Sequence, residues 1–266
     1  MKNKENINLP PSLQTEIIND PFDNRINKLA ISYATDFWAG SWKELLIEPT
    51  SGTQFGTYDQ NGDIYQETQN ILKQNNIEPN KNWPEIVWQK AGSRSIFIDG
   101  VPLKQFWTIE SATNAIQKFV SPILDGGFGG KIITLKESDK IVGFTAYTVA
   151  EPSIGAKLVS QRFSYKNLDL ESLINNQYPG QNVGIFLDFA ISENNRGKGI
   201  GSKLFDIRLD QMVKDGAEVI IGRTIKSSPA QYYGNYIARG LEPIADDPTN
   251  CDKKIFAVKV SNIKSR

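Results

Sequence analysis

The hydrophobic and polar positions along the chain change their spacing near residue 90. Before it, apolar residues recur at intervals of three and four over 24–38, which predicts an amphipathic helix, and a second helix is expected over 63–74. Beyond it, short runs of β-branched residues alternate with helical segments. We therefore expect residues 1–90 to form a mainly helical N-terminal extension, whose first residues are mobile, and residues 91–266 to form the principal domain.

The second part of the chain predicts a mixed fold of the α/β (α+β) class. Residues 131–147 predict a hairpin, because two strand-like runs are joined by a short polar turn. The order of strand, loop, helix and strand that follows indicates an α/β or α+β sheet rather than a bundle or a sandwich. The other expected elements are an apolar run at 95–98, strands at 184–191 and 218–224, and helices at 108–123, 169–176, 199–214 and 228–240.

Composition narrows the possible chemistry. Thirty basic residues balance thirty acidic ones, which gives no reason to expect a nucleic-acid partner or an anionic membrane surface. A single cysteine and no histidine exclude an internal disulfide and make a metal site unexpected, so proton transfer must rely on other side chains, water or the substrate. The N-terminus lacks an apolar stretch long enough for a signal peptide or a membrane span, and a cytoplasmic location is expected.

The segment after the strand at 184–191 carries the clearest chemical signal. There the chain reads Arg196-Gly197-Lys198-Gly199-Ile200-Gly201, directly before an amphipathic helix. Glycines allow a tight turn that brings backbone N–H groups close to a ligand, and the helix N-terminus adds partial positive charge. Such a loop suits a phosphate, and two basic side chains can add charge. Its spacing is neither that of a dinucleotide-binding fold nor that of a P-loop.

The loop matches the signature Arg-x-x-Gly-x-Gly, and about 94–260 of the chain resembles the GNAT superfamily of N-acetyltransferases. The step Val142-Gly143-Phe144 is similar to the glycine-aromatic step of that family's hairpin. The run Tyr236-Ile237-Ala238-Arg239-Gly240-Leu241 resembles the family's Tyr-x-x-x-Gly-Phe, with leucine in place of phenylalanine. The link at 150–183 is long for the family. The resemblance implies a GNAT-like mixed, mostly antiparallel sheet flanked by helices.

This resemblance also implies an activity. Family members transfer an acyl group directly from a thioester to an amine, so the expected reaction moves an acyl group, acetyl in the simplest case, from acetyl-CoA or another acyl-CoA to a primary amine of a small molecule or peptide. No covalent enzyme intermediate and no metal is implied. The residues that the resemblance places against the cofactor are Phe189, Ala190, Ile191, Arg196, Gly197, Lys198, Gly199, Ile200, Gly201 and Ser228.

Two residues are candidates for proton transfer. Asp188 lies on the strand that precedes the loop and could accept the amine's proton through water, or could only orient a neighbouring loop or a cationic acceptor; Glu151 is an alternative base. Tyr236 takes the place of the tyrosine that the family uses to protonate the departing thiolate. It could equally be a packing residue, and Tyr232 and Tyr233 are near alternatives.

Two other functions remain open from the sequence. An acyltransferase of this kind could take a longer fatty acyl chain from an acyl carrier protein and lipidate a peptide amine, because both donors present the same pantetheine arm. A non-catalytic module could keep the acyl-CoA site without turnover. In each case we expect 1–90 and 150–183 to shape the acceptor side of the cleft, since the donor loop has its own backbone contacts.

Overall fold

The fold is described from a computed structural model, for residues 9–33, 45–46, 94–98, 101–107, 109–163, 168–225, 230–247 and 250–264. They belong to two compact units. The first unit draws on Met1–Asn19, Phe119–Ala190 and Arg196–Arg266, and the second on Asp20–Lys118 and Ile191–Asn195. The helix predicted over 63–74 and the division near residue 90 lie outside the described residues, so both stay predictions.

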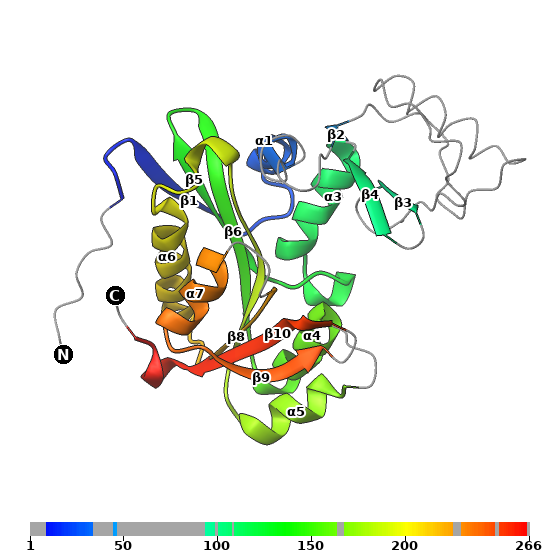
Figure 1. The fold of residues 1–266 in the computed structure, drawn as a ribbon, viewed down its shortest axis with the longest axis vertical. Coiled ribbons are helices and arrows are strands. Elements are labelled where there is room, and N and C mark those ends of the chain that lie inside the picture. The colour runs from blue at the N-terminus through cyan, green and yellow to red at the C-terminus, as the bar shows by residue number, and fades with distance from the viewer. Residues whose placement is uncertain are drawn as a thin grey trace, which may run out of the picture. The chain divides into compact units, whose positions relative to one another are not determined.

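A seven-stranded mixed sheet forms the centre of the first unit (Figure 1). Its strands lie in the order β1-β5-β6-β7-β8-β10-β9. The pairs β1/β5, β5/β6, β8/β10 and β9/β10 are antiparallel, whereas β7/β8 is parallel. The predicted mixed, mostly antiparallel sheet is therefore confirmed. The strands are β1 Leu13–Ile18, β5 Lys131–Glu137, β6 Lys140–Ala150, β7 Val183–Ile191, β8 Val219–Ile225, β9 Glu242–Asp247 and β10 Asn250–Lys259.

The hairpin predicted over 131–147 is present as β5 and β6. Its register runs from Lys131 opposite Tyr147 to Glu137 opposite Lys140, with one irregularity after Leu135. Almost every residue of β6 is buried, because this strand has neighbours on both edges and helices on its faces. The predicted strands at 184–191 and 218–224 correspond to β7 and β8.

Helices cover both faces of this sheet. Those that follow the hairpin are α4 Pro152–Phe163, α5 Leu170–Gln177, α6 Ile200–Lys214 and α7 Ala230–Ala238. Neighbouring residues of β7 show the two faces: a Cβ placed on Gly184 would meet Met212 of α6, whereas Val183 lies against Gly155 of α4. Thus α6 packs on one face and α4 on the opposite face.

The helix α4 was not predicted, whereas α5 was. Gly155 lies inside α4 and weakens a helical signal, but an added Cβ there would come within 2.7 Å of Val183 Cβ, so the glycine permits close packing on the sheet. For α5 the signal was local. Asp169 caps its N-terminus by accepting a hydrogen bond of 3.0 Å from the Ser172 N–H.

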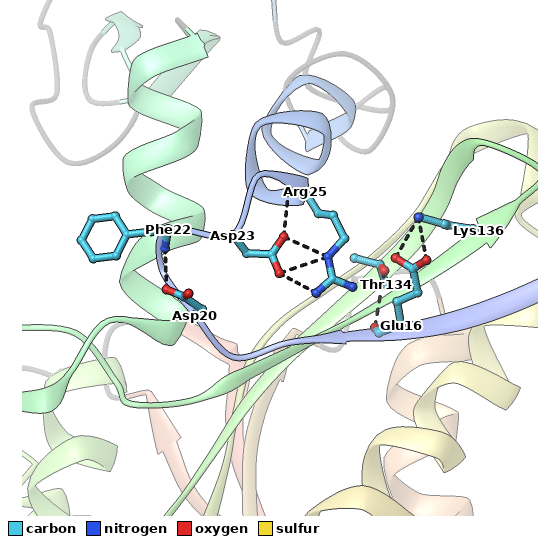
Figure 2. Close-up of polar contacts among 7 residues, drawn as sticks. All are labelled: Glu16, Asp20, Phe22, Asp23, Arg25, Thr134 and Lys136. Atoms are coloured by element: carbon cyan, nitrogen blue, oxygen red, sulfur yellow. Dashed lines mark hydrogen bonds and ion pairs between the residues drawn. The ribbon is translucent and has the colours of Figure 1, made fainter.

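The strand β1 was also not predicted and lies within the range expected to be a helical extension. It pairs with β5 along its whole length, and Lys136 Nζ lies 2.7 Å from a carboxylate oxygen of Glu16 (Figure 2). Only Leu13 and Ile18 of this edge strand are buried, so its sequence lacks the alternation that predicts a strand. Tertiary pairing, rather than local pattern, explains it.

The described residues of the second unit form the helices α1 and α3 and a small sheet. The helix predicted over 24–38 corresponds to α1 Arg25–Ser32, and its part at 34–38 lies outside the described residues. The helix predicted over 108–123 corresponds to α3 Ile109–Val120. Ahead of α1, the Asp23 carboxylate accepts hydrogen bonds from the Arg25 side chain and backbone (Figure 2). The small sheet has the order β2-β4-β3, with β2 Leu45–Leu46, β3 Arg94–Ile98 and β4 Val101–Trp107.

Candidate functional site

The glycine-rich loop has the backbone geometry of an open anion site. Gly197 and Gly199 both adopt left-handed conformations, with φ of 75° and 74°, and open space lies where their side chains would be. Gly199 is the N-cap of α6 and supplies no side chain to bond the first turn. The first intrahelical bond within this turn runs from the Lys203 N–H to the Gly199 carbonyl. The N–H groups before it point toward the exposed loop, as phosphate binding requires.

The strand that leads into this loop parts from its neighbour. The parallel pairing of β7 with β8 joins Val183–Ile185 to Val219–Ile221 and stops there, although β7 continues to Ile191 and β8 to Ile225. Beyond Ile185, β7 therefore has backbone groups that β8 does not use. In a parallel pair the loops that follow both strands lie at the same end of the sheet, beyond the carboxyl ends of the strands. The opening and the start of α6 therefore lie at the same end.

Four aromatic rings fill the α6 and α7 side of the opening. We call Phe186, Phe205, Tyr236 and Phe256 the aromatic cluster. Its ring centroids lie 5.3–5.6 Å apart in edge-to-face contacts. The Tyr236 side chain is fully buried, and its hydroxyl donates a hydrogen bond of 3.3 Å to the Arg223 carbonyl of β8. The hydroxyl of the predicted proton donor thus lies against β8 beyond its last pair with β7, in a buried aromatic environment.

Gly222 allows the rings to reach β8. A Cβ at this position would lie 2.3 Å from Phe186 Cδ2 and 2.7 Å from the Tyr236 hydroxyl oxygen, so the rings lie directly on the glycine backbone. The sequence did not single out this residue.

The strand β7 is irregular at Asp188. Phe186 and Phe189 both lie against Phe205 and Arg208, although residues three apart in a regular strand point to opposite faces. Between these two residues β7 therefore departs from the regular alternation of a strand. Asp188 lies in this stretch, and its carboxylate accepts a hydrogen bond of 2.7 Å from the Phe189 N–H. This contact is compatible with an orienting role, and the catalytic role stays a prediction.

Two arginines that the sequence analysis missed hold the carbonyl groups of this irregular stretch. The Asp188 carbonyl accepts from Thr145 Oγ1 at 3.0 Å and from Arg208 Nη1 at 3.4 Å. The Arg208 guanidinium is fully buried and lies 3.6 Å from the Phe186 ring centroid. From α4, Arg162 Nε and Nη2 donate to the Leu187 carbonyl.

Arg239, which is fully buried, joins the C-terminal end of α7 to the first turns of α6. Arg239 forms two hydrogen bonds with the Asp206 carboxylate, donates to the Ser202 carbonyl and hydroxyl, and also reaches Asn235. Because α6 begins at the glycine loop and α7 carries Tyr236, this network fixes the tyrosine relative to the loop. The helix α7 ends at Ala238, and Gly240, the predicted left-handed terminator, has a φ of 82°.

The other predicted site residues have varied surroundings. Ser228 lies outside the described residues, as do the side chains of Tyr232 and Tyr233. Ile191 is buried at the end of β7, and Ala190 is half-buried. Glu151 is exposed ahead of α4 and accepts a hydrogen bond of 3.0 Å from Ser153 Oγ.

Two further features concern metal binding and membrane insertion in the part of the chain that the structure describes. No group of three or more histidine, cysteine, aspartate or glutamate residues there could hold a metal ion. No helix among the same residues is both long and apolar enough to span a bilayer.

Comparisons with known proteins give matches among solved structures. No protein-family model matches the sequence, and no curated protein matches it. A ribosomal-protein-S18-alanine N-acetyltransferase from Escherichia coli is 12% identical, with a TM-score of 0.33 over 48% of this chain and 68% of its own. A putative acetyltransferase from Salmonella typhimurium, solved with acetyl-CoA, is 13% identical, with a TM-score of 0.37 over 56% of this chain and 73% of its own. A chain of the NatC complex bound to Gag peptide and CoA is 12% identical, with a TM-score of 0.40 over 93% of this chain and 98% of its own.

Proposed function

We propose that this chain is a GNAT-type N-acyltransferase, which moves an acyl group from acyl-CoA to a primary amine. The observation that carries the proposal is the uncapped, glycine-rich start of α6 at the edge where β7 has parted from β8. The loop can bind the pyrophosphate through backbone N–H groups and the helix dipole. The backbone of β7 beyond Ile185 can then pair with the amide groups of the pantetheine arm, as a neighbouring strand would.

The proposed reaction is a single displacement. The amine nitrogen attacks the thioester carbonyl carbon, a C–N bond forms, the C–S bond breaks, and the CoA thiolate leaves and takes up a proton. An alkylammonium with a pKa of about 10 must first lose its proton, for which Asp188, acting through water, is the proposed acceptor. Tyr236 is the proposed donor to the thiolate, because its hydroxyl lies in the opening between the strands. The sulfur would replace the Arg223 carbonyl as the partner of that hydroxyl.

Calorimetry with acetyl-CoA, longer acyl-CoAs and a phosphopantetheine-bearing carrier protein tests the donor site directly. We expect acetyl-CoA to bind with a dissociation constant at or below about 1 mM and its acetyl group to appear on an amine when a panel of amines is offered. Binding of the carrier protein alone would move the donor assignment to acyl carrier protein. A chain that binds none of these donors is not an acyltransferase of this type.

A second function has one observation in its favour. The Tyr236 hydroxyl is buried and already bonded to a carbonyl, which suits a packing residue in an acyl-CoA-binding module without turnover. Acyl-CoA binding without acyl transfer to any amine of the panel would favour this module.

A further inference from the structure

The face of the opening away from the aromatic cluster carries positive charge. Gly222 faces the cluster, so Arg223, the next residue of β8, points to the opposite face of the sheet. Its guanidinium carbon lies 5.5 Å from the ring centroid of Phe163, the last residue of α4. The Arg223 cation therefore lies on the α4 side of β8, in the part of the strand that is not paired with β7.

A second arginine lies against the same ring. The Arg162 guanidinium carbon is 5.9 Å from the Phe163 centroid. Its Nε and Nη2 donate to the Leu187 carbonyl of β7, two residues beyond the last β7/β8 pair. Arg162 thus binds one strand of the opening and Arg223 belongs to the other, and both guanidinium groups lie against the ring of Phe163.

The two arginines differ in what they contact. Arg162 donates hydrogen bonds to a carbonyl of β7. Arg223 is half-buried, and among the residues that the structure describes its guanidinium contacts the ring of Phe163. A partly desolvated guanidinium beside a second cation is favoured by a nearby anion. Its planar fork matches a carboxylate with two parallel hydrogen bonds.

We propose that Arg223 binds a carboxylate of the acceptor, so that the substrates are amines that carry a carboxylate group. This inference rests on the proposed acyl transfer. The loop at the start of α6 takes the donor's phosphates and the aromatic cluster closes the α6 and α7 side, which leaves the α4 side for the acceptor. A carboxylate held by Arg223 would direct the amine end of the same molecule toward the thioester between β7 and β8.

The inference can be tested without any variant by comparing pairs of acceptors of equal length. With acetyl-CoA as donor, ω-amino carboxylates of about three to six carbons are assayed beside the corresponding ω-amino amides. We expect kcat/KM for the best carboxylate to exceed that of its amide by about 10- to 100-fold, the effect of a hydrogen-bonded charge pair. Equal values across the series would overturn the inference.

The variant Arg223→Gln assigns the preference to this side chain. It should lower kcat/KM for the carboxylate by about 10- to 100-fold, mainly by raising KM, and leave kcat/KM for the amide unchanged. For Arg223→Lys we expect a kcat/KM for the carboxylate between those of the parent and of Arg223→Gln. A purely structural arginine would affect both acceptors equally. Arg223→Met keeps an unbranched chain over Phe163 if the glutamine variant folds poorly. Lys259→Gln removes one charge from an exposed position of β10 and should change nothing.

Three further outcomes separate this inference from the proposed function and from a related source of the same anion. Acetyl-CoA binding and acetylation of amines without a carboxylate preference would overturn this inference and leave the acyltransferase standing, whereas a lack of binding to every donor tested would overturn both. If succinyl-CoA is preferred over butyryl-CoA and Arg223→Gln removes that preference, the carboxylate belongs to the acyl group, and the acceptor assignment is wrong.

Discussion

Gly199 is held in a backbone conformation that a β-branched residue rarely adopts, in a loop with open space around it. Gly199→Val should raise the dissociation constant for acetyl-CoA by at least about 10-fold, because the side chain occupies the proposed pyrophosphate position and strains the turn. Calorimetry measures this change. Gly126→Val is the matched control, since Gly126 also has a φ of 75° and open surroundings but lies elsewhere in the chain. Equal affinities in both variants would contradict the loop assignment.

The Tyr236 hydroxyl distinguishes catalysis from packing. Tyr236→Phe keeps all four rings of the aromatic cluster and removes a hydrogen bond of 3.3 Å, so the free energy of unfolding should fall by less than about 1 kcal/mol. Turnover should fall by about 100-fold if the hydroxyl protonates the thiolate, with acyl-CoA affinity unchanged. Single-turnover assays and denaturant unfolding provide the two measurements. Unchanged turnover would leave Tyr236 a packing residue.

At the scale of single residues, sequence reasoning finds glycines in loops and misses side chains that act through distant contacts. The loop at the start of α6 was predictable because its glycines, its basic residues and the helix after it are contiguous. Arg208 and Gly222 were not predictable, since their roles depend on a carbonyl of β7 and on rings that come from other elements. One indication for Arg208 was present in the sequence, because a charged residue on the apolar side of a predicted helix needs a buried partner.

Among the elements, the contact of the aromatic cluster with β8 is the most sensitive to a small change. Gly222→Ala would place a methyl group within 2.3 Å of Phe186, which lies in a packed cluster and cannot withdraw freely. We expect a loss of about 1–3 kcal/mol in the free energy of unfolding, together with reduced turnover as the Tyr236 hydroxyl shifts.

Gly234→Ala provides the control for this substitution. Gly234 lies in α7, and nothing lies within 4 Å of its Cβ position. Alanine there should stabilise the protein by about 0.5–1 kcal/mol, because alanine favours a helix. Chemical denaturation of both variants tests the contrast, and a Gly222→Ala protein as stable as the parent would show that the rings do not depend on this close approach.

The elements that were predicted share a local cause, and those that were missed share a tertiary one. The hairpin of β5 and β6, the helix α5 and the pair formed by β7 and α6 each have a turn, a cap or a periodic pattern in their own sequence. The helix α4 contains a glycine that matters only against β7, and β1 is an edge strand whose exposed residues outnumber its buried ones. Such segments take their conformation from the surface that they cover.

At the scale of the whole molecule, one polar group connects the hairpin to the end of α6. The Asp215 carboxylate accepts hydrogen bonds from Lys131 of β5 at 2.9 Å, Tyr147 of β6 at 2.8 Å and Gln211 at 3.1 Å. Burial opposes ionisation, but these donors outweigh it and hold the pKa of Asp215 below its usual value. Burial, followed by the bond to Asp215, raises the pKa of Tyr147, which therefore stays protonated as a donor.

This group makes folding stability depend on pH at the acidic end. A carboxyl whose pKa is lowered by folding stabilises the protein above its unfolded pKa of about 3.9 and loses that effect as the pH falls through the folded value. Asp215→Asn should therefore reduce the free energy of unfolding by about 1–3 kcal/mol at pH 7 and flatten its decline below pH ~4. Asp139→Asn, in the exposed hairpin turn, is the control. Parallel curves for the parent and Asp215→Asn would contradict this role.

The position of β1 changes how the N-terminal part can be studied. A chain that begins near Trp83 would lose β1, and with it the partner of β5 and the ion pair between Glu16 and Lys136. A shortened chain would therefore test the integrity of the sheet as well as the expected role of 1–90 on the acceptor side. Internal deletions beyond residue 33 keep β1 and α1, and suit that question better.

The parting of β7 from β8 also bears on how the chain avoids aggregation. A strand without a neighbour offers its backbone to any other strand, and here such an edge lies in the middle of a sheet. Arg162 occupies the Leu187 carbonyl, and Thr145 and Arg208 donate to the Asp188 carbonyl. A bound thioester arm would complete the same edge with amide groups of its own. Under the proposed function, substrate recognition and protection from self-association depend on the same backbone groups of β7, and without a bound donor Arg162 still covers the Leu187 carbonyl.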